Sequence, residues 1–175
     1  MNLIIVSSNE IAYSLRWFSR NRAEIKSRPT VKTYVQLARA EAYTQKQLYK
    51  EAISILEKLD RIYPKTEVIL YYLCSAYLMS GNFEKAFYKL QNIYQKGIYH
   101  PKLLRLFAEA SRKSDKKAQS YEAMSDFYAL RGEYGASLDQ LRLARSHVKV
   151  RSTKHARILE KMNDIKLLQE EVVLR

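Results

Sequence analysis

The sequence predicts an all-α fold, an α-solenoid of about eight or nine helices that pair as hairpins and wind into a right-handed superhelix. The first observation behind this prediction is an internal repeat, because the segment 47–56 (QLYKEAISIL) matches the segment 81–90 (GNFEKAFYKL) at a displacement of 34 residues. The second is composition: only four glycines and three prolines interrupt 175 residues, which favours helices with short connections. The third is that no stretch alternates long enough to predict a strand.

Small residues recur in the repeat where two helices of a hairpin would meet. Ala52 and Ala86 occupy equivalent positions, and Ala40 and Cys74 precede them at a constant offset. Small side chains let helix axes approach closely, since the interaxial distance depends on the residues at the contact. We therefore expect all four in the core. A helix–turn–helix unit of this length resembles the tetratricopeptide repeat.

The repeat register divides one structural domain into three parts. We expect an N-terminal capping helix over residues 1–29, tetratricopeptide-like repeats over 30–147 and a C-terminal capping helix over 148–175, since the ends of a solenoid need covering. Two repeats span 33–66 and 67–100, and a third begins at Pro101. Ser137 lies one and a half periods after Ala86, so we expect the helix from about Lys117 to Leu130 to pack on both its neighbours.

The chain is strongly basic, with 31 lysines and arginines against 18 acidic residues and a formal net charge of +13. Such an excess favours acidic protein partners, nucleic acid or an anionic lipid surface, but basic residues that simply coat solvated helix surfaces are the preferred explanation. The basic residues gather in three clusters, at 16–32, at 112–117 and at 142–161. Nucleic acid is the less expected partner, because the aromatic residues occupy packing positions rather than alternating with cations as stacking platforms.

The residues argue against an enzyme. A single cysteine, Cys74, excludes an internal disulfide and a four-cysteine zinc site. His100, His147 and His155 lack the one-turn spacing of a zinc-hydrolase helix, and His100 precedes Pro101 as a turn residue would. Phosphate-loop and nucleophile-elbow motifs are missing as well. We expect no catalytic residues, no metal ligands, no cofactor and no small-molecule substrate.

No apolar stretch approaches the roughly 20 residues of a membrane span. The first ten residues lack the basic leader and long apolar core of a signal peptide. We therefore expect no membrane span, and a cytoplasmic location if the chain is a complete product.

The first helix of each hairpin should turn its free face toward an inner, concave surface that binds a partner. In this register the surface changes from aromatic and apolar to cationic, which suits a protein segment with a hydrophobic anchor and an acidic or carboxylate end. An ordinary mixed surface is the alternative interpretation. The expected partner-binding residues are Tyr34, Glu41, Gln45, Tyr71, Leu78, Met79, Arg105, Glu109, Arg112 and Lys113.

The second half of the chain also carries a more specific pattern. The pattern consists of Ser125, Phe127, Tyr128 and Gly132, then Ala136, Leu138, Gln140 and Leu141, then Ala156, Arg157 and Ile158. Over residues 30–168 the chain resembles the C-terminal repeat domain of BepA-like periplasmic zinc metallopeptidases. The HExxH-bearing half of that family has no counterpart here.

The resemblance implies a non-catalytic scaffold that docks a protein segment or a subunit of an assembly machine. It also implies a role in outer-membrane protein assembly and quality control, and a periplasmic location if the chain belongs to a longer metallopeptidase. The alternative is a free-standing cytoplasmic tetratricopeptide adaptor.

Overall fold

The computed structural model describes residues 31–97 and 100–173. The chain divides into two units, Met1–Tyr34 and Val35–Arg175, and the second holds nearly all of the described residues. The predicted capping helix at 1–29 lies outside the described residues.

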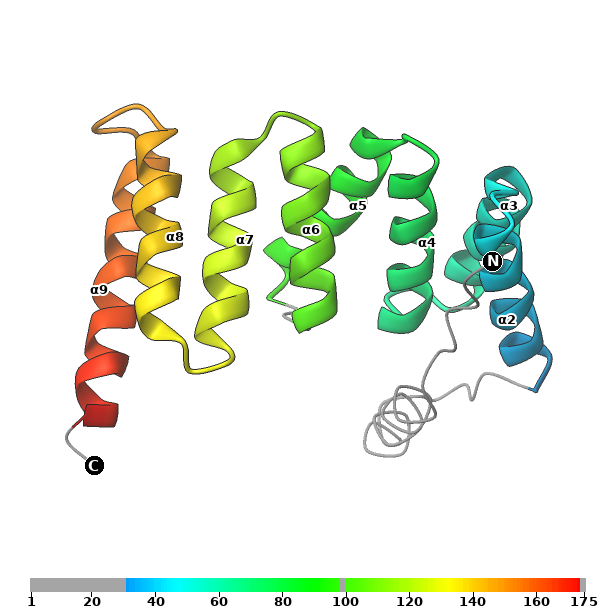
Figure 1. Cartoon of the computed structure of the whole chain (residues 1–175), viewed down its shortest axis with the longest axis horizontal. Coiled ribbons are helices and arrows are strands. Elements are labelled where there is room, and N and C mark those ends of the chain that lie inside the picture. Colours follow the sequence, from blue (N-terminus) through cyan, green and yellow to red (C-terminus); the bar gives the residue numbers. More distant parts are fainter. Residues whose placement is uncertain (1–30, 98–99, 174–175) are drawn as a thin grey trace, which may run out of the picture. The chain divides into compact units, whose positions relative to one another are not determined.

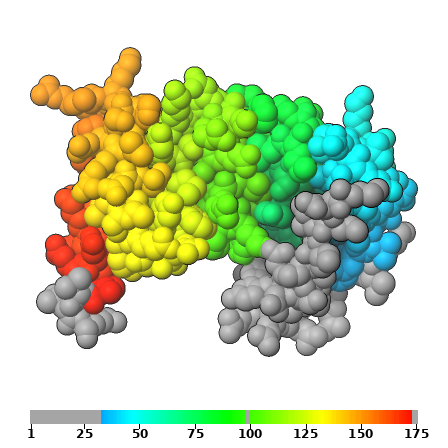
Figure 2. All heavy atoms as spheres, viewed as in Figure 1, coloured from blue at the N-terminus to red at the C-terminus, as the bar shows by residue number. Residues whose placement is uncertain are grey.

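The described part of the chain is entirely helical, with eight α-helices and no strand. In order these are α2 (Val31–Gln45), α3 (Tyr49–Ile62), α4 (Glu67–Met79), α5 (Phe83–Gln95), α6 (Pro101–Lys113), α7 (Lys117–Ala129), α8 (Tyr134–Ser146) and α9 (Thr153–Val173). From α3 onward each helix packs against the next, and Figure 1 shows them succeeding one another in chain order. In the space-filling view, the coloured part of the surface likewise changes colour in sequence order (Figure 2). The predicted all-α stack of helix hairpins is confirmed.

The backbone turns repeat with the period found in the sequence. Gln47, Gly81 and Asp115 are spaced 34 residues apart, and all three have a positive φ, of 61°, 79° and 57°. The residue after each turn donates its N–H to a carbonyl five positions back, at 2.9 Å for Leu48 and 2.8 Å for Asn82. This bond is typical of a helix that ends through a left-handed residue. Only one of the three turns uses glycine, so the repeated feature is the turn conformation rather than the residue type.

The small residues of the repeat are buried as predicted. Ala40, Ala52, Cys74 and Ala86 each have 0% exposed surface. Ser137 is also fully buried, and α7 packs against both α6 and α8. The prediction that the helix starting at about Lys117 packs on both its neighbours is therefore confirmed.

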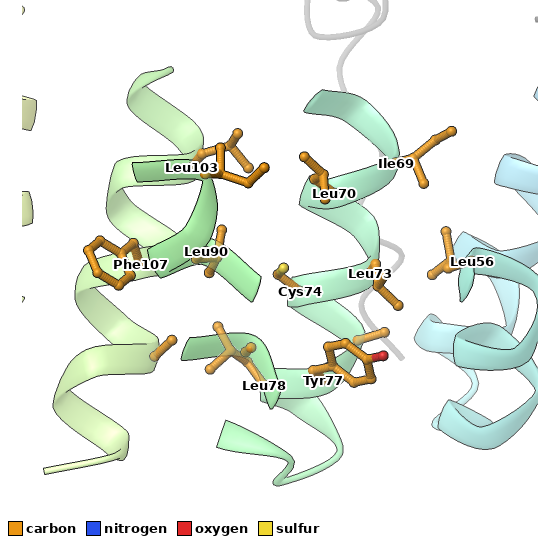
Figure 3. Close-up of a cluster of buried hydrophobic side chains, with 14 of the residues drawn as sticks. Leu56, Ile69, Leu70, Leu73, Cys74, Tyr77, Leu78, Leu90, Leu103 and Phe107 are labelled. Atoms are coloured by element: carbon orange, nitrogen blue, oxygen red, sulfur yellow. The ribbon is translucent and has the colours of Figure 1, made fainter. Parts of the chain in front are cut away.

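Helix α4 is apolar on two sides because it packs against three other helices, α3 on one side and α5 and α6 on the other. Figure 3 shows Leu73 directed toward Leu56 of α3, whereas Cys74 and Leu78 are directed toward the side on which Leu90 and Phe107 lie. The nearly continuous apolar sequence of α4 follows from this position, since a helix that is apolar around most of its circumference is a buried one.

A second core cluster joins α8 to α9. Leu138 and Leu141 of α8 pack with Ile158 and Ile165 of α9. The contact between α7 and α8 includes a buried polar pair, because the hydroxyls of Ser125 and Ser137 are hydrogen-bonded at 2.8 Å. Two short side chains that satisfy one another let these helices lie close together without leaving a buried hydroxyl unpaired.

Candidate interaction surface

The first helices of the first three hairpins are linked side by side through contacts between α2, α4 and α6. The hydroxyl of Tyr72 on α4 donates to Glu41 Oε2 on α2 at 3.3 Å. The ring of Tyr72 meets that of Tyr71 edge to face, with centroids 5.6 Å apart. Lys102 Nζ on α6 lies 5.8 Å from the centroid of the Tyr71 ring. These contacts place one side of the three helices on a common surface, which we call the A face.

The surroundings of Tyr72 further favour its protonated form. Burial, followed by the nearby Glu41 carboxylate and the hydrogen bond to it, raises the pKa of Tyr72 to about 12. The phenol therefore stays protonated at neutral pH and remains a donor to Glu41. The sequence reasoning missed Tyr72 because the apolar pattern of α4 gives no sign of which of two adjacent tyrosines meets the neighbouring carboxylate.

Helix α6 contributes the charged part of the A face. Arg105, Glu109, Arg112 and Lys113 are all exposed, and their spacing puts them on one side of the helix. Within residues 31–97 and 100–173, none of the four forms an ion pair within 4.0 Å. Their charges therefore have no ion-pair partner in the described part of the fold.

Two of these cations also lie over aromatic rings of neighbouring helices. Arg105 Cζ is 5.8 Å from the centroid of Phe127 on α7, and Lys113 Nζ is 5.6 Å from that of Phe83 on α5. The predicted packing role of the aromatic residues holds for Phe83, which packs against the core cluster, but cations also lie over these rings. The stacking of helices brings residues far apart in sequence together, so Phe83 is covered by one of the protein's own cations and Phe127 by two, Arg105 and Arg131.

One of the ten residues predicted to lie on the binding surface is buried instead. Leu78 is only 8% exposed and belongs to the main hydrophobic cluster. Its burial follows from the packing of α4 directly against α6, which covers this position. The next residue, Met79, is 56% exposed and presents its side chain to solvent.

The remaining predicted residues differ in their exposure to solvent. Gln45 is exposed, whereas Glu41 and Tyr71 are half-buried in the contacts between α2, α4 and α6. Tyr34 is 41% exposed but belongs to the first unit of the chain. Binding of a partner to any of these residues remains a prediction.

The second helices of the hairpins are joined by ion pairs instead. Lys89 on α5 pairs with Asp60 on α3. Lys161 Nζ on α9 lies 2.5 Å from Asp126 Oδ1 on α7, and the Tyr94 hydroxyl on α5 donates to the same carboxylate. We call the surface that carries these contacts between α3, α5, α7 and α9 the B face.

The most buried charge of the B face is Glu122 on α7. Its side chain is 4% exposed and accepts two hydrogen bonds from Arg157 Nη2 on α9, at 2.9 and 2.6 Å. A carboxylate withdrawn from water needs such a partner, because an unpaired buried charge is strongly destabilising. The Arg157 charge therefore contributes to holding α9 against α7.

Among the described helices we find no cluster of metal-ligand residues and no helix able to span a membrane. In residues 31–97 and 100–173, no three histidine, cysteine, aspartate or glutamate side chains gather as ligands would. None of the helices α2–α9 combines the length and hydrophobicity that crossing a membrane requires.

The described residues form an α-solenoid whose A face carries cations of α6 without a carboxylate partner among those residues. No protein-family model matches the chain, and no curated protein is significantly similar to it.

Proposed function

We propose that this chain is a non-catalytic docking domain that binds a protein segment through its A face. The observation that supports the proposal is the contrast between two sets of cations in the described residues. Arg105 and Arg112 have no carboxylate partner within 4.0 Å, whereas Lys89, Arg157 and Lys161 of the B face each pair with a carboxylate of another helix. Charges left unpaired on one surface are available to attract and orient a partner of opposite charge.

The chemistry of the A face defines the kind of segment it would bind. Met79 and the half-buried Tyr71 offer an apolar and aromatic contact. The arginines of α6 offer donors that can hold a carboxylate through two hydrogen bonds. The expected ligand is a peptide with an apolar anchor followed by acidic residues or a free carboxyl terminus.

The resemblance to BepA-like metallopeptidases supplies a biological setting for this proposal. The chain would act as the docking part of a protein that assists outer-membrane protein assembly and quality control in the periplasm. Its partner would then be a subunit of the assembly machine or a client segment. The competing proposal is a cytoplasmic adaptor that uses the same surface on an unrelated partner. A complete gene sequence separates the two, since an upstream HExxH helix and signal peptide favour the first.

Nucleic acid is a second candidate partner, favoured by the net charge of +13 and by the cations that lie over Tyr71, Phe83 and Phe127. Binding of this kind weakens steeply with salt, with a log–log slope of about 0.9 per phosphate contacted on duplex DNA. Titration of a fluorescent duplex at several salt concentrations tests it. A steep slope with submicromolar affinity at about 0.15 M salt would favour nucleic acid over a peptide.

The test of the docking proposal is a crosslinking pull-down from the native cell, repeated with Arg105→Glu combined with Arg112→Glu. The matched control is Lys50→Glu with Lys58→Glu, which changes the charge equally at two exposed positions of α3. We expect the partner to be lost with the α6 variant and kept with the control, while the circular dichroism of both equals that of the parent. Equal recovery with both variants would remove the A face as the binding surface.

A further inference from the structure

Two of the basic clusters seen in the sequence come together around one cavity. The cavity has a volume of about 510 Å³ and lies between the α6–α7 turn and the α8–α9 connection. Figure 1 shows that these two connections lie at the same end of the helices, opposite the α7–α8 turn. The cavity is large enough for a small ligand.

The lining of the cavity is strongly cationic. Lys116 and Lys117 come from the α6–α7 side, and Lys149 and Lys154 come from the α8–α9 side. Asp115 is the one acidic residue of the lining, which leaves three positive charges in excess. In the described part of the chain, no carboxylate lies within 4.0 Å of these four lysines. A concave site lined by one sign of charge concentrates the potential that attracts a counter-ion.

The backbone adds to the positive character of this cavity. Helix α7 begins at Lys117 without a side-chain cap and without an acidic residue in its first turn. Lys117, Ala118 and Gln119 line the cavity, so the unsatisfied N–H groups of the first turn lie beside it. Those N–H groups and the helix dipole favour an anion.

The opposite wall is held in place by an aromatic contact. The imidazole of His147 stacks on the ring of Tyr121 from α7, with centroids 5.5 Å apart and an angle of 14° between the planes. Val148 follows in the same lining and packs against the α8–α9 core. Both contacts attach the α8–α9 connection to the body of the fold, which keeps Lys149 and Lys154 near the α7 terminus.

We propose that this cavity binds a small polyanion through a chain of phosphoryl groups, as found in a nucleoside triphosphate or in inorganic polyphosphate. Lysines act as mobile point charges toward phosphate oxygens, and helix N-termini bind phosphate by their N–H groups. The molecule is a ligand rather than a substrate. The site lies apart from the A face, because Arg105 and Arg112 are not part of its lining.

The test is isothermal titration calorimetry of the full chain with sodium tripolyphosphate in about 0.05 M NaCl. We expect one ligand per chain, with an affinity that falls as salt is added. Lys117→Gln combined with Lys154→Gln should weaken binding by about tenfold or more, since each removes a charged contact. The control Lys50→Gln with Lys58→Gln removes the same charge on α3 and should change the affinity by less than about twofold.

Titrations with other ligands identify the source of the phosphoryl groups, and some of their results would overturn the proposal. Stronger binding of ATP or GTP than of tripolyphosphate indicates a nucleotide, and equal binding indicates that the phosphates alone are recognised. Equal loss in the pocket and control variants would show general charge attraction and overturn the proposal. Equal affinity for citrate, or no measurable binding of tripolyphosphate, would overturn it as well. Lys117 and Lys154 are exposed, so both variants should melt like the parent.

Discussion

The A face and the B face use charge in opposite ways. On the B face, Glu122 and Asp126 of α7 receive Arg157 and Lys161 of α9, so opposite charges join successive helices. On the A face, the cations of α6 have no such carboxylate in the described residues, and lie over rings or face solvent. The contrast indicates that the ion pairs of the B face stabilise the stack, and it supports our proposal that the A face binds a ligand.

The strongest test of this geometry is the reactivity of thiols on opposite sides of α4. Cys74 is the one cysteine of the chain and has 0% exposed surface, and burial raises its pKa to about 12. We expect iodoacetamide to label native Cys74 about a thousandfold more slowly than the unfolded chain, because reaction requires opening of the fold. Met79→Cys in a Cys74→Ala background should be labelled at close to the unfolded rate. Rapid labelling of native Cys74 would show that the register of α4 is wrong.

The core between the two faces is tested by Ala86→Phe on α5. Ala86 is fully buried at a close helix contact, so a phenyl ring there must displace its neighbours. We expect the free energy of unfolding to fall by roughly 1–3 kcal/mol or more. Urea unfolding followed by circular dichroism measures the loss. A midpoint like that of the parent would mean that Ala86 does not lie between packed helices.

The B face is tested by Arg157→Ala, which leaves the Glu122 carboxylate buried without its two hydrogen bonds. We expect a loss of about 1–2 kcal/mol, less than for a fully buried pair, because the Arg157 side chain is 58% exposed. The control is Arg112→Ala on the A face, which should lie within about 0.5 kcal/mol of the parent. Losses of equal size would remove the distinction between the faces.

The smallest effect concerns the start of α6, whose cations belong to the A face. The Nδ1 atom of His100 accepts a hydrogen bond from the Lys102 N–H at 3.3 Å. Burial, and then the charge of Lys102, lowers the pKa of His100 below its ordinary value. A lowered pKa means that the stability contributed by neutral His100 is complete above about pH 6.5 and is lost as the pH falls through the folded-state pKa.

His100→Asn tests this interpretation, since asparagine can cap the helix without titrating. Between pH 7.5 and 5.5 the parent should lose up to about 1 kcal/mol more than the variant, as measured by urea unfolding. Identical losses would show that His100 does not contribute to the pH dependence.

The sequence predicted the fold well because its period reflects a packing requirement. Ala52 and Ala86 recur where helices touch, and a larger side chain would not fit there. The turns were harder to predict, since Gln47 and Asp115 adopt the conformation in which Gly81 is the expected residue. Leu78 was misassigned because a helix packed on both sides has no clear apolar stripe.

The pairing of charges could not be predicted at all. Glu122 and Arg157 are 35 residues apart, and which of many exposed charges meet depends on rotamers and helix crossing geometry. The same holds for the cationic cavity, whose two sides come from clusters separated by about one repeat of sequence. Sequence periodicity thus predicts which residues are buried, while the contacts between polar side chains require the three-dimensional structure.

The most direct measurement of the contrast between the faces compares two double variants with the same loss of charge. Arg105→Gln with Arg112→Gln changes the A face, and Arg157→Gln with Lys161→Gln changes the B face. In urea unfolding we predict a loss of less than about 1 kcal/mol for the first and of about 2 kcal/mol or more for the second. Equal losses, or a larger loss for the A-face variant, would contradict the account in which the B face stabilises the stack and the A face does not.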